Sequence, residues 1–252
     1  MKILITNDDG IHAEGIYALA KEMSKKHEIT VVAPREQKSA CSHSISLEGV
    51  MKVKEEKLEG LACKAYSVLG TPADCTQIGL ALLAKDAQLV ISGINRGLNC
   101  GTDVLYSGTV SAAIEGAINH VPSIAISMEV DWEKHDEEYE KAALWVSKIV
   151  DIAEKKFLRK DVVLNINVPN RPEHLIKGLK VCGLGQFTYR SEYILLEDKD
   201  ERVYTINAIK SKIEESNTDR YYLSEGYVTL TPLQFDFTHY KMLQEVENIF
   251  NR

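Results

Sequence analysis

Short apolar runs alternate with helical patterns over the first two thirds of the chain. Between the apolar runs, apolar residues recur at the spacing of one helix face, as in Ile16, Leu19, Ala20 and Met23. This alternation predicts βαβ units and an α/β fold, in which helices cover both faces of a doubly wound, mostly parallel sheet. The expected strands are Ile3–Thr6, Ile29–Ala33, Ala65–Leu69, Leu89–Ile91, Ile124–Ser127 and Val162–Val168. The other expected helices begin at Thr71-Pro72 or cover Val110–Asn119 and Tyr139–Phe157.

The pattern changes after Pro169, where strand-like segments follow one another. We expect a core of residues 1–170 and a β-rich C-terminal extension of residues 171–252 that serves as an appendage or an oligomerisation arm. A helix over Tyr240–Phe250 is expected near the end of the chain. The strand-like segments are Lys177–Val181, Tyr189–Leu196, Val203–Lys210 and Gly226–Leu230.

Composition and charge argue against nucleic-acid polymers and membranes as binding partners. The 252 residues carry 30 Lys and Arg against 37 Asp and Glu, a net charge of −7, so the overall field does not attract a nucleic-acid polymer. No apolar run is long enough to span a bilayer, so no membrane partner is expected. The five cysteines are odd in number and form no CxxC pair, and no signal peptide precedes the first strand, a pattern typical of a reduced, cytoplasmic protein.

Two adjacent carboxylates end the first expected strand, in the segment Asn7-Asp8-Asp9-Gly10. A plain turn is one interpretation, because Asn, Asp and Gly are common turn residues and Asp also caps helices. A cation site is the other, because neighbouring carboxylates repel each other and a divalent ion relieves that repulsion. Carboxylate oxygens suit Mg²⁺, Mn²⁺ or Ca²⁺, and ligands of parallel sheets bind at the carboxyl ends of strands.

A long Gly-rich connection, Ser92–Ala113, follows the strand that ends at Ile91. It contains four glycines and two asparagines, and a connection of this length and composition is usually functional or disordered. It ends in Ser107-Gly108-Thr109-Val110, which places hydroxyls and backbone N–H groups at a helix N-terminus. Such a terminus is a ready site for phosphate.

Other polar segments have simpler interpretations. Segment 33–47 is by itself a flexible surface loop, and segment 70–75 is a capped helix start. We interpret His12, His43 and His120 as surface or core residues, because none forms a metal-like cluster with another. The sequence has no GxGxxG after its first strand, no P-loop, no GxSxG elbow and no HExxH.

Six segments, taken in their order and spacing, resemble the SurE family of survival-protein, metal-dependent nucleotidases. The resemblance runs from residue 2 to about residue 233. The segments are ILITNDDG (3–10), APREQKSACSHSISL (33–47), LGTPADC (69–75), SGINRGLNCGTDVLYSGTVSAAIEG (92–116), LNINVP (164–169) and GYVTLTPL (226–233).

The resemblance implies a Rossmann-like core with a C-terminal part that reaches over a partner in a homodimer or tetramer. It implies hydrolysis of nucleoside monophosphates, at 5′ and in some members 3′ positions, and sometimes of short polyphosphate. It also implies one divalent cation per subunit, held by Asp8, Asp9, Ser39 and Asn95. Ala40 stands where many family members have glycine, and it is strained if that position needs a positive φ.

From these residues we expect a metal-assisted hydrolysis. The metal polarises the phosphoryl group and binds or orients the attacking water. Asp8 or Asp9 takes a proton from that water. The phosphoryl oxygens are cradled by Asn95, Ser107, Gly108 and Thr109, and Asn7 is assigned to the same substrate-binding set.

Two alternatives differ in chemistry. Phosphatases with an aspartyl-phosphate intermediate place a DxD pattern after the first strand, whereas Gly10 stands two residues beyond Asp8 and Ile11 two beyond Asp9. A nucleotide-binding regulatory protein with a metal site but little turnover stays open on the sequence alone.

Overall fold

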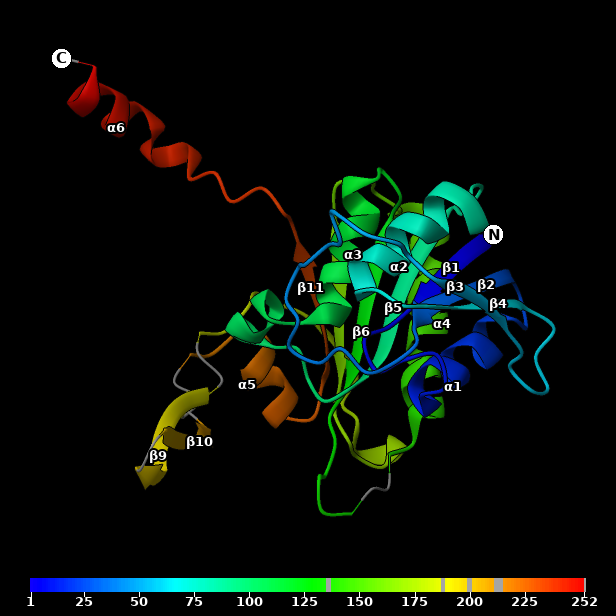
Figure 1. Cartoon of the computed structure of the whole chain (residues 1–252), viewed down its shortest axis with the longest axis horizontal. Helices are drawn as coiled ribbons and strands as arrows, with labels where there is room; N and C mark the ends of the chain where they lie inside the picture. The colour runs from blue at the N-terminus through cyan, green and yellow to red at the C-terminus, as the bar shows by residue number, and fades with distance from the viewer. Residues whose placement is uncertain (135–136, 187–188, 199–200, 211–214, 252) are drawn as a thin grey trace.

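A nine-stranded sheet forms the centre of the molecule, in the order β3-β4-β2-β1-β5-β6-β7-β11-β8 (Figure 1). The computed structural model describes residues 1–134, 137–186, 189–198, 201–210 and 215–251. The strands from β4 to β7 in this order run parallel, whereas β3 is antiparallel to β4 and β11 is antiparallel to β7. The strands are β1 (Lys2–Thr6), β2 (Glu28–Pro34), β3 (Val53–Glu56), β4 (Lys64–Val68), β5 (Leu89–Arg96), β6 (Ser123–Met128), β7 (Val163–Val168), β8 (Leu179–Val181) and β11 (Val228–Leu233).

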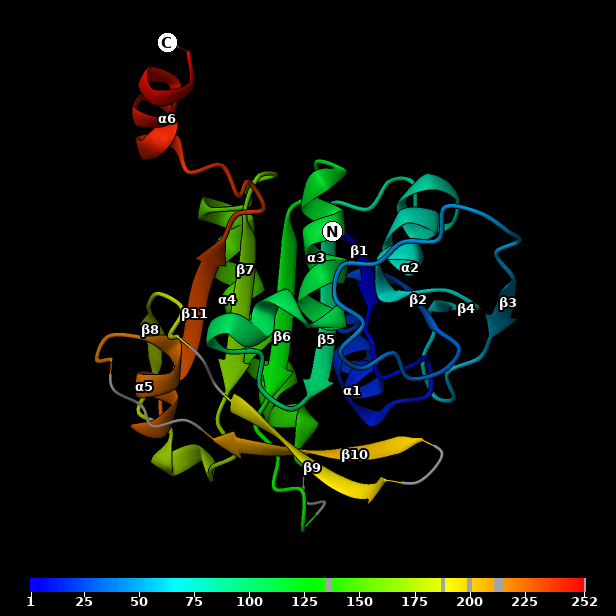
Figure 2. The same cartoon turned by 60° about the vertical axis from the view of Figure 1, so that its left-hand side comes forward.

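Helices cover both faces of this sheet (Figures 1 and 2). Helices α1 (Glu14–Met23) and α4 (Tyr139–Lys156) pack together on one face, and α2 (Pro72–Ile78) and α3 (Gly108–Ile118) pack together on the other. The prediction of an α/β fold with a doubly wound, mostly parallel sheet is confirmed. The helix expected at Thr71-Pro72 begins there, because the Thr71 hydroxyl and the Asp74 carboxylate cap it reciprocally.

The central strands are apolar along their whole length because helices bury both of their faces. Ile3 and Ile5 of β1, Ile91 of β5 and Ile124 of β6 each have at most 1% of their surface exposed, and they join the core beneath α1 and α4. Leu4 points to the opposite face and packs in the core near α2. This frame fixes the positions of the loops that leave the carboxyl ends of the strands.

The C-terminal part extends the sheet and then leaves it. Strands β8 and β11 lie at one edge of the main sheet, while β9 (Tyr189–Asp198) and β10 (Arg202–Lys210) form a separate antiparallel pair. Helix α6 (Leu243–Phe250) lies at the end of an arm that projects from the body (Figures 1 and 2). The division at residue 170 stays a prediction, and the main sheet continues across it.

One strand and one α-helix were not predicted from the sequence. Strand β3 is a charged and largely exposed edge strand, so its residues show no apolar alternation. Helix α5 (Asp219–Ser224) is short and lies among strand-like segments, and its start is marked by Thr218, whose side chain accepts a hydrogen bond from the Tyr221 N–H. No helix among the described residues is long and apolar enough to cross a membrane.

Candidate functional site

The four predicted metal ligands lie on polar segments at the ends of three neighbouring strands. Strands β2, β1 and β5 lie side by side and run parallel, so the polar segments at their carboxyl ends meet at one edge of the sheet. These segments contain the carboxylates Asp8 and Asp9, the hydroxyl of Ser39 and the amide of Asn95.

Asp8 is a buried carboxylate, 4% exposed, and Thr109 holds it in place. The Thr109 hydroxyl donates to Asp8 Oδ1 at 2.5 Å, and the Thr109 backbone N–H donates to Asp8 Oδ2 at 3.1 Å. The same hydroxyl lies 3.5 Å from Asn95 Oδ1. Thr109 therefore connects two of the four predicted metal ligands.

Gln37 connects the other two predicted ligands. Its side-chain amide donates to Asp9 Oδ1 at 3.2 Å and to Ser39 Oγ at 2.9 Å. The second oxygen of Asp9 accepts the Arg96 backbone N–H at 2.9 Å. The sequence interpretation missed Gln37, although its position two residues before Ser39 in the same polar loop places it within reach.

The two carboxylates share a poorly solvated position. Burial raises the pKa of Asp8 to about 6, against the hydrogen bonds from Thr109, and the charge of Asp9 raises it further. Burial also raises the pKa of Asp9, against hydrogen bonds from the Arg96 N–H and Gln37. A positive charge beside the pair would lower both pKa values, so the site favours a cation.

The N-terminus of α3 lies directly against Asp8. Ser107 is the N-cap, and its hydroxyl accepts the Val110 N–H at 3.1 Å. Of the first three N–H groups of the helix, those of Thr109 and Val110 are bonded to Asp8 and Ser107, and that of Gly108 has no partner among the described residues. The Gly108 N–H and the Ser107 hydroxyl hydrogen are therefore the donors available for an anion at this helix end.

Gly108 allows the helix to approach the carboxylate this closely. A Cβ added at Gly108 would lie 2.8 Å from Asp8 Cβ and 2.9 Å from Cys41 Sγ. Asp8 Cβ is fixed to the backbone at the end of β1, so it cannot rotate away from such a methyl group. The geometry at this position therefore requires glycine.

Asn7 has both of its polar groups bonded within the turn. Its side-chain amide donates to the Gly10 carbonyl oxygen at 2.9 Å, and its side-chain oxygen accepts the Gly10 N–H at 3.1 Å. Gly10 has a φ of +103°, which glycine adopts without strain. The contacts of Asn7 are those of a residue that shapes the loop carrying Asp8 and Asp9.

A model of the family described as Survival protein SurE matches residues 3–191. The chain belongs to the SurE family. It is 65% identical over 250 residues to the 5′-nucleotidase SurE of Clostridium botulinum (strain Alaska E43 / Type E3), an alignment that covers 99% of this chain and 100% of that protein. It is 60% identical over 253 residues to the 5′-nucleotidase SurE of Clostridium beijerinckii, with 100% of both chains covered. The crystal structure of SurE protein from Aquifex aeolicus matches with a TM-score of 0.86 at 33% identity and covers 99% of each chain.

In this SurE chain, polar contacts tether the loop that carries Ser39. His43 Nε2 lies 2.8 Å from Oε2 of Glu115, a buried residue of α3 that also accepts from Gln77 at 2.9 Å. Burial acts to raise the pKa of Glu115, but the hydrogen bonds with His43, Gln77 and Asn119 hold it below its usual value. Ser46 donates to Asp74 at the start of α2, from its backbone at 2.8 Å and from its hydroxyl at 2.7 Å. The structure thus brings His43 together with an acidic partner, and we infer that it positions the loop.

Ala40 has the positive φ that would make an alanine strained at this position. Its φ is +53°, in the left-handed region that costs a residue with a Cβ more than it costs glycine. The tethers at His43 and Ser46 hold the loop on the far side of this turn, so the surrounding structure maintains the strain next to Ser39.

Buried polar contacts also hold the Gly-rich connection. The backbone carbonyl oxygen of Asn99 accepts the side-chain amides of Asn165 at 2.9 Å and Asn167 at 3.0 Å, and the Asn99 N–H donates to Asn167 Oδ1 at 2.8 Å. The Gly101 N–H donates to the buried carboxylate of Asp219 at 2.8 Å. The asparagines of LNINVP therefore support the loop that leads to α3.

The ligand types at the site limit which metal it could hold. No group of three His, Cys, Asp or Glu side chains is arranged to hold a metal anywhere in the described part of the chain. The predicted set has two carboxylates, one amide oxygen and one hydroxyl, all of them hard oxygen ligands. This set fits Mg²⁺ or Mn²⁺ with some positions left for water or substrate oxygens, and it does not fit a thiolate or imidazole zinc site.

Proposed function

We propose that this SurE chain is a divalent-metal-dependent phosphomonoesterase that hydrolyses nucleoside monophosphates to nucleoside and phosphate. Its relatives are named 5′-nucleotidase SurE at identities of 65% and 60% across the whole chain. One observation carries the proposal: the N-terminus of α3 lies against Asp8 of the carboxylate pair, through Thr109 and the close approach of Gly108. A phosphate ester and its counter-cation need two such sites side by side.

Asp8, Asp9, Ser39 and Asn95 would hold one Mg²⁺ or Mn²⁺ per subunit. When bound, the ion supplies a Lewis acid for the phosphoryl oxygens and lowers the pKa of a bound water. The two carboxylates supply the negative charge of the ligand set, and Thr109 and Gln37 keep the ligands oriented.

The other residues of the site then have distinct roles in the proposal. The Gly108 N–H and the Ser107 hydroxyl donate to the phosphoryl oxygens, and they meet the charge that grows on those oxygens in the transition state. Asp9 is the more accessible of the two carboxylates, and its partners are an amide and a backbone N–H, so it is the better placed of the two to accept a proton from the attacking water. Asp8 is held by two hydrogen bonds from Thr109 and serves the site as a fixed charge.

These contacts of Asp8 also argue against the alternative of a phosphatase that forms an aspartyl-phosphate intermediate. A nucleophilic carboxylate needs one oxygen aimed at the phosphorus atom, whereas both oxygens of Asp8 accept hydrogen bonds from the same residue, Thr109. Acid quenching during turnover of a ³²P-labelled nucleotide should therefore leave no label on the protein.

Phosphate release from a nucleotide panel tests the proposed activity. We expect release from 5′-nucleoside monophosphates in Mg²⁺ or Mn²⁺, loss of release in excess EDTA, and recovery when the metal is restored in excess. Adding 3′-nucleotides, p-nitrophenyl phosphate and short polyphosphate to the panel defines the breadth of the activity. Nucleotide binding without release of phosphate from any substrate would favour the regulatory alternative instead.

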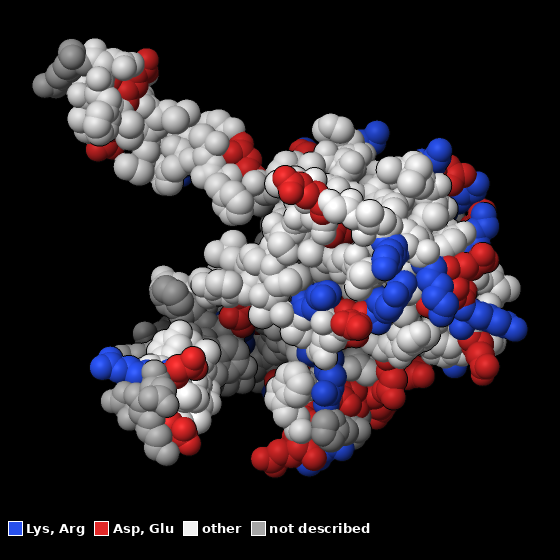
Figure 3. All heavy atoms as spheres, in the orientation of Figure 1, with Lys and Arg blue, Asp and Glu red and all other residues white. Residues whose placement is uncertain are grey.

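We further propose that the chain forms a homo-oligomer through its C-terminal part. The arm and α6 leave six large apolar or aromatic side chains between 43% and 81% exposed, namely Phe237, Tyr240, Leu243, Val246, Ile249 and Phe250. Figure 3 shows this arm as mostly uncharged, while charged side chains gather on the opposite side of the molecule. The β9–β10 pair exposes further apolar residues, including Tyr193 and Ile206. An apolar surface of this extent is typical of an interface.

Light scattering after gel filtration tests the oligomer. We expect a mass at least twice the 28.2 kDa of the single chain. Placing charges on the apolar side of α6, with Val246→Asp and Ile249→Asp together, should lower that mass, whereas the same change at an exposed polar position of the helix, Gln244→Asp, should not. A single-chain mass for the unmodified protein at micromolar concentration would contradict the oligomer. Because all five cysteines are free thiols, we also propose a reducing, cytoplasmic location.

A further inference from the structure

A cavity adjoins Asp9, one of the two carboxylates. It has a volume of about 360 Å³, and the residues that line it include Asp9, Gln37, Arg96, Glu14, Glu137 and Tyr139. A second cavity, of about 400 Å³, shares these last three residues and continues along α1 towards Tyr17. Together they form a cleft that begins at a predicted metal ligand, and each part lies in the size range of small-molecule sites.

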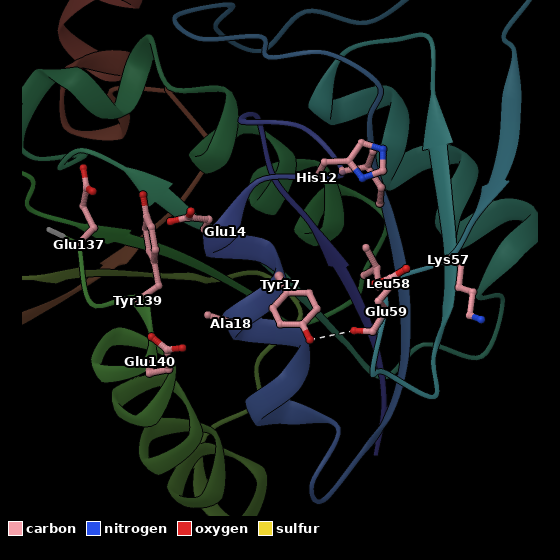
Figure 4. Close-up of a pocket in the computed structure, with 11 residues that line it drawn as sticks. His12, Glu14, Tyr17, Ala18, Lys57, Leu58, Glu59, Glu137, Tyr139 and Glu140 are labelled. Carbon is pink, nitrogen blue, oxygen red and sulfur yellow. Dashed lines mark hydrogen bonds between the residues drawn. The ribbon is translucent and has the colours of Figure 1, made fainter. Parts of the chain in front are cut away.

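The hydroxyl of Tyr139 is an unusual feature of this cleft. The residue is 6% exposed, it lines both cavities, and its hydroxyl has no hydrogen-bond partner among the described residues. Figure 4 shows its ring extending from the start of α4 towards Glu14 and Glu137. The hydroxyl is not among the fully buried polar atoms that lack a partner, so its oxygen opens to the cleft and is available to a ligand there.

The charges around the cleft indicate what kind of ligand it takes. Arg96 Nε pairs with Glu137 Oε1 at 2.8 Å, and the guanidinium lies 4.7 Å from the centre of the Trp132 ring, so its charge is already compensated. Glu14 is exposed at the mouth of the cleft. Burial, together with the charges of Glu137, Asp9 and Glu14, raises the pKa of the Tyr139 hydroxyl, which stays protonated and can donate. Around Tyr139 the cleft offers the carboxylates of Glu14 and Glu137 and one hydroxyl, whereas Lys57 and His12 line only the second cavity. The part beside Asp9 therefore suits a neutral group rich in hydroxyl and amino donors.

We propose that this cleft binds the nucleoside part of the substrate, with Tyr139 and Glu14 forming hydrogen bonds to it. This inference rests on the proposed nucleotidase activity, because a nucleotide whose phosphate lies at the start of α3 needs a place for its sugar and base beside the carboxylates. A ribose diol donates well to a carboxylate, which assigns the sugar to Glu14. The Tyr139 hydroxyl then pairs with a polar atom of the same nucleoside.

The Tyr139→Phe variant tests the assignment of the cleft. We expect KM for AMP to rise by about 3- to 10-fold, the worth of one hydrogen bond, while kcat changes by less than about 2-fold. The kinetics of p-nitrophenyl phosphate, which has no sugar, should stay within about 2-fold of the unmodified protein. Tyr222→Phe is the matched control, because the Tyr222 hydroxyl donates to Asn217 Oδ1 at 2.7 Å and Tyr222 lines neither cavity.

The Tyr139→Phe substitution should not destabilise the fold. Removing a hydroxyl that has no partner should leave the thermal unfolding temperature of Tyr139→Phe equal to or above that of the unmodified protein. An unchanged KM for AMP, or an equal change for AMP and p-nitrophenyl phosphate, would overturn the proposal.

Two further measurements test the contact between Glu14 and the sugar, and keep the test of the cleft independent of the nucleotidase activity. With Glu14→Gln, the preference for AMP over 2′,3′-dideoxy-AMP should shrink by about 3- to 10-fold, and an unchanged preference would remove Glu14 from the proposal. If the unmodified protein releases no phosphate from any substrate, the proposed function fails, and calorimetric titration of adenosine into the unmodified protein and Tyr139→Phe still tests the cleft. Equal binding of adenosine, or none, would then overturn the inference.

Discussion

We expect the Asp8→Asn variant to lose about 10³-fold of kcat/KM for a nucleoside monophosphate, and to lose it even in excess Mn²⁺. The substitution keeps the shape of the side chain but removes one of the two negative charges that favour a cation. It also places an amide NH₂ against Thr109, which now donates to both oxygens of the carboxylate at 2.5 and 3.1 Å. The variant therefore loses ligand charge and ligand orientation together.

Metal binding can be measured separately from activity for this variant. An ion that binds only the folded state raises the unfolding temperature by mass action, so Mn²⁺ should raise it for the unmodified protein and not for Asp8→Asn. Asp161→Asn is a suitable control, because Asp161 is an exposed carboxylate paired with Arg159 at 2.8 Å and far along the chain from the site. An Asp8→Asn variant that kept its activity and its response to Mn²⁺ would remove Asp8 from the ligand set and contradict the proposed function.

The order and type of the main elements could be read from the sequence because each is encoded locally. The apolar run Ile3–Thr6 is buried on both faces, and the helix at Thr71 begins where its capping box requires. The parallel strands bring their carboxyl ends to one edge, where the Thr109 hydroxyl contacts both Asp8 and Asn95, two residues that the family resemblance had placed together.

The contacts that support the site could not be predicted from the sequence, because they join residues far apart in the chain. His43 and Glu115 are 72 residues apart, and the Gly101 N–H reaches Asp219 across 118 residues. No periodicity marks such pairs, because each depends on the exact placement of two loops after the sheet has formed. The role proposed for Tyr139 could not be predicted for a related reason: a tyrosine on the apolar side of α4 is interpreted as a core residue, and only its unpaired hydroxyl distinguishes it.

The Gly108→Ala variant should lose about 10²-fold of kcat/KM, the second largest effect that we expect, because a displacement of about 1 Å at a reacting centre has this consequence. The added methyl group would lie 2.8 Å from Asp8 Cβ and 2.9 Å from Asp8 Oδ2, so either the carboxylate or the start of α3 must move. Both groups belong to the proposed site, one to the cation and the other to the phosphate. Alanine is otherwise favoured over glycine in a helix by up to about 1 kcal/mol, so a general loss of helix stability is not expected.

Two further variants test which contact of the added methyl group causes the loss of activity. A Cβ at Gly183 meets no atom within 4 Å, so Gly183→Ala should retain full activity. The methyl group at position 108 would also lie 2.9 Å from Cys41 Sγ, but that sulfur can rotate away, so adding Cys41→Ala to Gly108→Ala should not restore the rate. Restoration would show that Cys41 alone caused the obstruction. Full activity in Gly108→Ala itself would show that hydrolysis does not depend on the close contact between the first turn of α3 and Asp8.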